Sequence, residues 1–563
     1  MNRLLWTCSL LLAAAWLAPL HVLPWVSWHN EALATAAVLV GCAGALAMQY
    51  RAKGTAAIQV PTLAVLPLFI AAWAVLQWAF GRIVYGGSVL AILSYALLAV
   101  AAAAAGHAAA RSESASHRSS ASPTLQLLAT ALLAVGLLQV VVVFSQVFTL
   151  WSGSDWVART AYETRGGGNV AQPNHAAHVF LLAFAAAVYL RQAGRVRPVL
   201  AGAALVMLCA GLATTQSRSG MLALAALFAW YVLRRAALPV RPSLPAAGAV
   251  AALAVALFAA WPVVAMGYWH ITGESVNLTT SGRTAIWAQL VEAVWMRPWF
   301  GWGVGQVAQA QNAIAHAYPM IYPSTYAHNL FLDLALWIGL PAALLAIAMM
   351  LRWLAPRVAA ARSLDTCFCV ALAIPLAVQA MTEFPYAYSY FLAPVFFALG
   401  MLDAWVGRGV ALRMPRHAAA GVLALWIGGT AWATVEYVRI EEDFRVARFE
   451  ALRVGKTPVA YEVPEVTVLT QLGALLRATR VQPEPGMPPE DIALLRDIAM
   501  LHPWGATNFR YATALALNGQ LDEAARQLQV LRAMQDAKAF ARLLEVLDEM
   551  AVQYPVLKQL RQP

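Results

Sequence analysis

The sequence predicts an all-α polytopic membrane protein with about thirteen transmembrane helices, followed by a C-terminal helical domain. Hydrophobic residues make up 61% of the 563 positions and charged residues only 12%, about half the charged share of an ordinary soluble domain. Apolar runs long enough to cross roughly 30 Å of hydrocarbon recur from Leu4 to about Glu436 and then stop. Basic residues also alternate between the connecting loops, as the positive-inside rule requires.

The apolar runs define the predicted spans, which all lie before residue 437. The first begins after Arg3 and resembles the start of a signal peptide, but we expect a retained helix. All five cysteines lie in or beside apolar runs, so no structural disulfide is expected. The predicted spans cover residues 4–20, 31–48, 59–79, 87–105, 123–145, 175–190, 198–214, 218–233, 246–266, 329–351, 366–382, 386–406 and 418–436.

The distribution of basic residues predicts the orientation. The N-terminus and the loops after every second span hold 17 Lys and Arg residues, whereas the intervening loops up to Glu436 hold 6. The first set is therefore expected in the cytoplasm of a bacterium, with the chain in the inner membrane. The long loop at about 267–328 and everything after residue 437 are then periplasmic. The net charge of +11 thus reflects orientation and does not indicate a nucleic-acid partner.

Residues 437–563 predict a separate soluble helical domain, because they are charge-balanced, with 15 basic and 16 acidic residues. Around the expected turn at Asn518-Gly519, small and large apolar residues follow the spacing of a tetratricopeptide-like (TPR-like) helix pair. Two packed amphipathic helices without a peptide groove fit the same spacing. Within the membrane domain 1–436, residues 106–122 are rich in Ser, Ala and His and predict a flexible cytoplasmic loop.

Arg218 is the strongest candidate for chemistry in the membrane domain. It lies in Thr-Gln-Ser-Arg-Ser-Gly, a polar hairpin too short to leave the membrane surface, between two short spans on the outer side. A charged group so close to lipid is costly and needs an explanation. A snorkelling arginine is one interpretation. An anion site is the other, because a guanidinium is permanently charged and matches phosphate oxygens.

Two further candidates lie in the large outer loop. Arg283 follows Ser281-Gly282 and begins an amphipathic stretch that contains Trp287, as expected for a helix at the membrane interface. His328 stands where the loop re-enters the membrane, and its imidazole is able to accept a proton from a hydroxyl near neutral pH. Interfacial anchoring and a structural histidine are the alternatives. Two arginines and a histidine on one face suit an anionic leaving group and a hydroxyl nucleophile.

Two other outer elements contain polar and aromatic residues. Gly166-Gly167-Gly168 leads into Gln172-Pro173-Asn174-His175, a turn that brings backbone close to a ligand and begins a span. Glu383-Phe384-Pro385 is followed by three alternating tyrosines, which are either interfacial aromatics or contacts to a sugar or acceptor. The outer loops lack paired carboxylates, and His175 with His178 has no matching ligand, so no metal site is expected.

These motifs resemble the O-antigen ligase and polymerase superfamily of bacterial membrane glycosyltransferases. Arg218, Arg283 with Trp287 and the Pro-x-x-Gly-x-Gly-x-Gly turn, and His328 in His-Asn-x-x-Leu match the ligase pattern in order and topology. Within the superfamily, the elements around Gln172 and Glu383 are most similar to the protein O-oligosaccharyltransferases (PglL type), which glycosylate pilins and other exported proteins. The resemblance covers nearly the whole membrane domain.

The resemblance implies a GT-C-like fold and en bloc transfer of an oligosaccharide from undecaprenyl pyrophosphate to Ser or Thr of a protein such as pilin, without cofactor or metal. Arg218 and Arg283 would bind the pyrophosphate, and His328 would orient or deprotonate the attacking hydroxyl. The remaining candidates for contacts with donor or acceptor are Gln172, Asn174, His175, Trp287, Tyr388 and Tyr390.

Three alternatives remain open. Lipopolysaccharide O-antigen ligase and O-antigen polymerase share the leaving-group chemistry and differ in the acceptor. A lipid-glycan transporter would show internal repeats and ionisable groups at mid-membrane. No repeat is evident in the sequence, and its acidic residues mostly lie near span ends.

Overall fold

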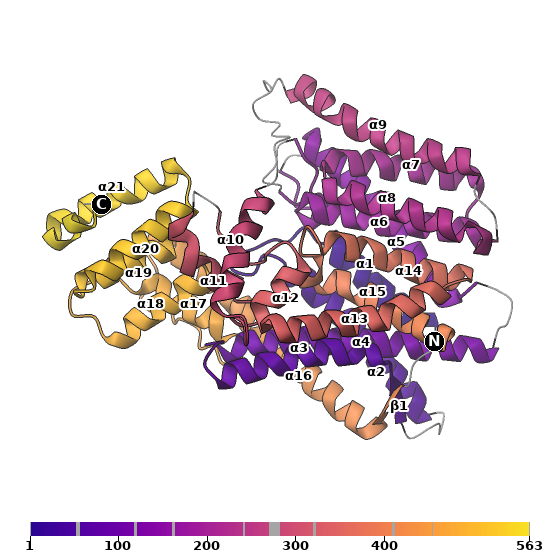
Figure 1. The fold of residues 1–563 in the computed structure, drawn as a ribbon, viewed down its shortest axis with the longest axis horizontal. Coiled ribbons are helices and arrows are strands. Elements are labelled where there is room, and N and C mark those ends of the chain that lie inside the picture. Colours follow the sequence, from indigo (N-terminus) through magenta and orange to yellow (C-terminus); the bar gives the residue numbers. More distant parts are fainter. Residues whose placement is uncertain are drawn as a thin grey trace. The chain divides into compact units, whose positions relative to one another are not determined.

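The computed structural model of the chain is almost entirely helical (Figure 1). It describes all residues except 1, 52–56, 117–120, 152, 160–163, 240–242, 270–281, 319–321, 408–410, 453, 562 and 563. The elements are α1 (Asn2–Leu17), α2 (Trp28–Arg51), β1 (Ala57–Val60), α3 (Val65–Ala79), α4 (Gly86–Ser116), α5 (Pro123–Val147), α6 (Pro173–Gln192), α7 (Pro198–Thr215), α8 (Arg218–Arg234), α9 (Leu244–Trp269), α10 (Arg283–Met296), α11 (Val307–Ile314), α12 (Leu330–Ile338), α13 (Leu340–Ala360), α14 (Leu364–Gln379), α15 (Ser389–Val406), β2 (Leu412–Pro415), α16 (Arg416–Ala451), α17 (Thr470–Arg480), α18 (Pro489–Leu501), α19 (Gly505–Leu517), α20 (Leu521–Met534) and α21 (Ala537–Gln553).

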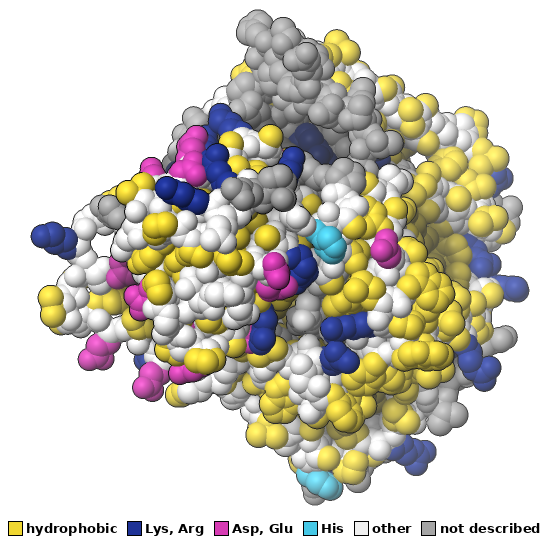
Figure 2. Space-filling view, turned by 60° about the vertical axis from the view of Figure 1, so that its left-hand side comes forward, with side chains coloured by type: hydrophobic (Ala, Val, Ile, Leu, Met, Phe, Trp, Pro, Cys, Tyr) yellow, Lys and Arg dark blue, Asp and Glu magenta, His cyan; other side chains and the backbone are white. Residues whose placement is uncertain are grey.

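The chain is a multi-pass membrane protein, as the sequence predicts. Among the described residues, eleven helices are long and apolar enough to cross a membrane, and two shorter apolar helices cover Arg3–Leu17 and Leu364–Gln379. Twelve of the predicted spans overlap most of a helix of this set, and the span 329–351 overlaps Leu340–Ala360 only in its second half. The count of thirteen crossings stays a prediction. On the face shown in Figure 2, hydrophobic side chains form broad areas with few charged groups, as expected for helices that face lipid.

The chain divides into two compact units. The first unit comprises Met1–Leu68, Ser94–Thr279 and Met349–Gly429, and the second comprises Phe69–Leu93, Thr280–Ala348 and Thr430–Pro563. In the first unit, α6 is buried on nearly all sides, between α5, α7 and α14. A helix that is apolar all round is expected at the centre of a bundle, and α6 brings its N-terminal residues into that centre.

One predicted span is wrong as a continuous helix. The apolar run 329–351 is divided at Gly339, which has φ +80° and separates α12 from α13. A Cβ at this position would lie 2.5 Å from the Trp299 carbonyl oxygen, so only glycine fits there. Apolarity alone does not reveal such a break, because both helices are hydrophobic.

Two other expectations need correction. The predicted loop 106–122 is helical as far as Ser116, where α4 ends. Its alanines have a high helix propensity, and Gly106 lets α4 approach α15 so closely that a Cβ would lie 2.0 Å from the Phe397 carbonyl oxygen. The fold also contains one short antiparallel strand pair, β1 with β2, so it is not purely helical.

The predicted end of the membrane domain, at residue 436, lies within a helix. Helix α16 continues through residue 436 without interruption. The Glu436 carboxylate accepts backbone hydrogen bonds from Thr467 (2.8 Å) and Leu469 (3.0 Å), which fixes the start of the following segment. Further along, α19 and α20 form the predicted helix pair, and Gly519 at their turn has φ +82°.

A buried ion pair in the first unit gives a stability prediction. The Arg357 guanidinium contacts the Asp403 carboxylate at 2.6 Å, and both side chains are at most 5% exposed. We expect Asp403→Ala to lower the free energy of unfolding by about 3–5 kcal/mol, because it leaves a buried charge unpaired. The midpoint of thermal aggregation in detergent measures this loss. Combining the change with Arg357→Met should restore part of the stability, and Arg445→Ala, in an exposed ion pair with Glu442, is the matched control.

Candidate active site

Arg218 lies at the first turn of α8, directly after the hairpin that follows α7. Gln216 adopts a left-handed conformation with φ +48° and ends α7. The Ser217 hydroxyl then accepts a hydrogen bond from the Gly220 backbone at 3.0 Å and caps α8. Ser217 is fully buried whereas Arg218 is exposed. The sequence prediction of a polar hairpin between two short spans is therefore confirmed, with Arg218 beside a helix N-terminus that favours anions.

A second arginine, which the sequence interpretation did not select, lies against the same hairpin. The Arg165 guanidinium donates from Nε to the Thr215 carbonyl at 2.9 Å. The neighbouring Gly166 backbone donates to the Thr214 carbonyl at 3.1 Å. The signal in the sequence is a basic residue directly before a glycine turn, in a loop predicted on the outer side.

The glycine turn itself has a structural role. The Gln146 side chain accepts hydrogen bonds from the Gly167 and Gly168 backbones, at 3.1 and 2.8 Å. Gln139 accepts from the Asn169 backbone at 2.9 Å. These backbone N–H groups are therefore hydrogen-bonded within the protein and are not offered to a ligand. The turn leads into a helix, as predicted.

The Gln-Pro-Asn-His element forms the N-terminus of α6. The Gln172 side chain accepts from the His175 backbone at 2.8 Å and acts as the helix cap. Asn174 donates from Nδ2 to the Glu383 carboxylate at 2.5 Å. Two motifs that are about two hundred residues apart are thus brought together in the first unit, and Glu383 is the partner that connects them.

The tyrosine-rich turn packs against the same helix end. The His175 ring lies 4.4 Å from the Tyr388 ring and 5.4 Å from the Phe391 ring, in edge-to-face arrangements. Tyr388 is half-buried, whereas His175 and Tyr390 are buried. Burial argues against direct substrate contact by Tyr390, so Tyr388 is the better candidate of the two.

His178, one turn further along α6, is paired with an amide. Its Nδ1 lies 2.6 Å from the Gln379 side-chain oxygen. Within the described part of the chain, no three His, Cys, Asp or Glu side chains gather as a possible metal site.

In the second unit, the structure brings Arg283 and His328 together. Arg283 begins α10, and Ser281 of the predicted motif lies outside the described residues. Trp287, one turn later, donates from its indole nitrogen to the Ala327 carbonyl at 2.8 Å. The helix that starts with Arg283 therefore holds the residue immediately before His328, and Trp287 makes the contact that positions it.

His328 itself adopts a left-handed conformation with φ +55°, which is uncommon for a residue other than glycine. Asp333 accepts from the Ala327 backbone at 2.9 Å, and Asn329 caps α12 by accepting from the Phe331 backbone at 3.0 Å. These contacts on both sides of His328 hold the conformation. Such local strain is frequent at functional sites.

The electrostatic environment keeps His328 neutral. Burial lowers the pKa of His328, the nearby positive charge of Arg283 acts in the same direction, and together they bring the pKa to about 4. The imidazole is thus unprotonated at neutral pH, which is the form of histidine that accepts a proton.

The Gly-rich turn after α10 fixes this region. Gly301 has φ +76°, and a Cβ there would lie 2.5 Å from the Trp337 carbonyl oxygen. The buried Gln77 side chain donates to the Phe300 and Trp337 carbonyls, at 2.8 and 2.7 Å. It also accepts from the Val304 backbone at 2.9 Å. The turn is therefore built for close backbone packing.

Chemically, the described groups suit displacement of an anionic leaving group. Arg283 supplies a permanent positive charge beside a neutral imidazole, and Arg218 supplies another at a helix N-terminus in the first unit. Such groups stabilise phosphate oxygens and accept a proton from a hydroxyl.

Comparison with known proteins finds two family models along the chain. The family model described as "O-Antigen ligase" matches residues 202–347, which include Arg218, Arg283 and His328. A second model, described as "Virulence factor membrane-bound polymerase, C-terminal", matches residues 367–545.

Two relatives from Acinetobacter baylyi extend the likeness. The general O-oligosaccharyltransferase is 24% identical over 548 residues, which cover 94% of this chain and 92% of that protein. The ComP-specific O-oligosaccharyltransferase is 36% identical over 124 residues, which cover 22% of this chain and 23% of that protein. The chain is therefore similar over nearly its whole length to the general O-oligosaccharyltransferase of Acinetobacter baylyi, and part of it matches the O-antigen ligase model.

Proposed function

We propose that this chain transfers a preassembled oligosaccharide en bloc from undecaprenyl pyrophosphate to Ser or Thr hydroxyls of exported proteins such as pilins. The reaction takes place on the periplasmic side of the bacterial inner membrane and uses no cofactor or metal. The observation that carries the proposal is the neutral His328 held beside Arg283 by the Trp287 contact to Ala327. The name of the full-length relative supports the transfer of glycan to protein.

In this mechanism, the acceptor hydroxyl oxygen attacks the anomeric carbon while the bond from that carbon to the phosphate oxygen breaks. The electron pair leaves with the pyrophosphate, whose growing charge Arg283 and Arg218 stabilise. His328 orients the hydroxyl and takes its proton. Attack opposite the leaving group inverts the anomeric configuration.

In this proposal, contacts with the acceptor or the donor come from Gln172, Asn174, His175 and Tyr388. The hydrogen bond from Asn174 to Glu383 and the packing of His175 on Tyr388 support a single preformed element at the start of α6. Residues 437–563 would form a TPR-like periplasmic domain of the enzyme.

The low pKa of His328 gives a pH prediction. A histidine with an ordinary pKa of about 6.5 would be roughly 90% protonated at pH 5.5, and a base of that kind would lose about tenfold in rate. Because burial and Arg283 lower the pKa of His328 to about 4, we expect kcat/KM for the lipid-linked donor to stay level from pH 7.5 down to about 5.5. Initial rates in overlapping buffers measure this profile, and an acid limb centred near pH 6.5 would contradict it.

The choice among acceptors is tested by deleting the gene. We expect pilin or another exported protein to lose its glycan, while lipopolysaccharide keeps its full length. Truncated lipopolysaccharide with intact protein glycosylation would indicate an O-antigen ligase, and single-repeat glycans would indicate a polymerase. Either result would exclude the proposed acceptor.

A further inference from the structure

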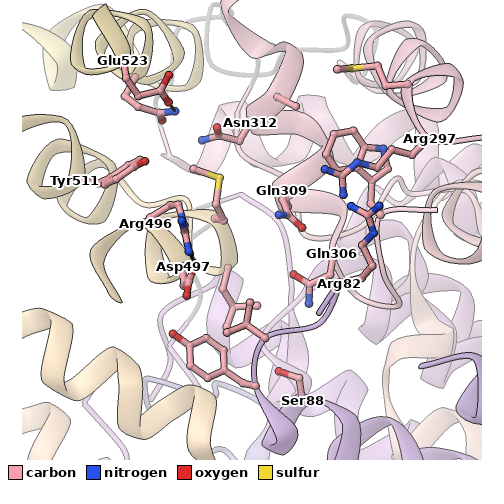
Figure 3. A pocket seen from close by; sticks show the side chains of 18 of the residues that line it. Arg82, Ser88, Arg297, Gln306, Gln309, Asn312, Arg496, Asp497, Tyr511 and Glu523 are labelled. Atoms are coloured by element: carbon pink, nitrogen blue, oxygen red, sulfur yellow. Dashed lines mark hydrogen bonds and ion pairs between the residues drawn. The ribbon is translucent and has the colours of Figure 1, made fainter. Parts of the chain in front are cut away.

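A cavity in the second unit, lined by both polar and apolar side chains, has no part in the chemistry described above. Its volume is about 420 Å³, within the usual range for small-ligand sites. Its walls come from the segment between α3 and α4, from the region of α10 and α11, and from helices α18 to α20 (Figure 3).

Two arginines face this cavity without a carboxylate partner. Figure 3 shows Arg82 and Arg297 next to each other on one side. Among the described residues, no acidic side chain forms an ion pair with either, whereas Asp497 and Glu523 in the cavity pair with other arginines. Burial lowers the pKa of Arg297, and the nearby Arg82 charge acts in the same direction. Two adjacent like charges are destabilising unless an anion lies between them.

The rest of the lining suits a hydroxylated ligand. Arg297 stacks on the Trp302 ring at 4.0 Å, which leaves the edge of its guanidinium for hydrogen bonds. Further polar groups in the lining are the side-chain amides of Gln306 and Gln309 and the hydroxyl of Tyr511. Gln527, which is fully buried, also lines the cavity, and its side-chain oxygen has no hydrogen-bond partner among the described residues. Such a buried acceptor calls for a donor from a ligand or water.

The position of the cavity relates it to the donor glycan. Met296 and Arg297 stand at the C-terminal end of α10, whereas Arg283 begins this helix of 14 residues. At about 1.5 Å of rise per residue, the two ends are roughly 20 Å apart. The cavity is therefore too far from Arg283 to hold the reacting sugar, but a short oligosaccharide attached to the pyrophosphate spans that distance.

We infer that this cavity binds the distal part of the donor oligosaccharide and selects glycans that carry an anionic sugar, such as a uronic acid, through Arg82 and Arg297. The inference rests on the proposed function, because it takes Arg283 as the pyrophosphate site. An acidic segment of the acceptor protein has similar charge, but the side-chain amides of Gln306, Gln309 and Gln527 beside the two arginines match the hydroxyl groups of a sugar.

The experiment uses the purified full chain with three donors on undecaprenyl pyrophosphate: one neutral sugar, a neutral tetrasaccharide, and a tetrasaccharide ending in two uronic acids. For the wild type, KM should be lowest with the acidic donor. The double variant Arg82→Gln with Arg297→Gln should raise KM for the acidic donor by about tenfold or more, because it removes both guanidinium groups that would bind the uronates. Its kcat, and its KM for the single-sugar donor, should not change. Arg542→Gln, an exposed arginine of α21 outside the cavity, is the matched control.

An equal rise in KM for all three donors, or no change for any, would overturn the inference. A rise confined to the KM of the acceptor protein would overturn it in favour of an acidic peptide site. If the wild type transferred glycan from no donor, the proposed function itself would fail. The cavity is then tested alone by saturation-transfer NMR with digalacturonate, which should bind the wild type and not the double variant. Equal signals from both proteins would exclude the site.

Discussion

Arg283→Ala is expected to reduce glycan transfer by about 10²–10³-fold in kcat, because removing one preorganised group that stabilises a developing negative charge costs that much in comparable sites. Arg283 lies at the start of α10, where its charge acts on the neutral His328 and on any phosphate bound there. The measurement is single-turnover transfer from a lipid-linked donor by the purified chain.

Two variants make this result specific. Arg283→Lys keeps the charge but loses the planar fork, so it should recover only part of the rate. Arg362→Ala removes an exposed arginine between α13 and α14 and should keep wild-type activity. Wild-type activity of Arg283→Ala in a chelator-containing buffer would remove this residue from the chemistry.

His328→Ala is expected to lower kcat by about 10²–10⁴-fold, which is the usual contribution of a general base. A structural role for this histidine predicts a different result, and His328→Asn distinguishes the two. Asparagine tolerates the left-handed conformation that His328 adopts at φ +55°, so the backbone should be preserved. The proton acceptor is lost, and the rate should fall as far as it does with alanine.

The controls for this prediction concern folding. His328→Asn should have the same thermal aggregation midpoint as the wild type, and His316→Ala, an exposed histidine of the same unit, should leave both rate and stability unchanged. Recovery of the full rate by His328→Asn would assign the histidine a structural role only.

The membrane helices were predictable because apolar runs of sufficient length reflect lipid directly. Their interruptions were not predictable in the same way. Gly339 lies in an unbroken apolar run, and the need for glycine there comes from the Trp299 carbonyl, which the sequence does not place beside it. Likewise, α16 crosses the expected boundary at 436 because the change of composition marks where lipid ends, not where a helix ends.

For the site, Arg218 and the start of α10 at Arg283 were predictable from local patterns. The supporting contacts were not, because their partners are distant in sequence. Gln77 binds backbone more than two hundred residues away, and Glu383 binds Asn174 across a similar separation. The sequence does contain one indication of these contacts, which is a polar side chain within or next to an apolar span. Leaving such a group without a hydrogen bond is costly in a membrane, so its presence implies a specific partner.

The most direct test of the central claim is a reconstituted reaction with the purified full chain, a lipid-linked oligosaccharide, a pilin-type protein and a lipid A core acceptor, all with chelator present. The account predicts that intact oligosaccharide appears on Ser or Thr of the protein and that the lipid acceptor stays unmodified. Arg218→Ala, Arg283→Ala and His328→Ala should each slow transfer by about 100-fold or more. Modification of the lipid acceptor alone, or extension of the donor glycan without any protein product, would contradict it.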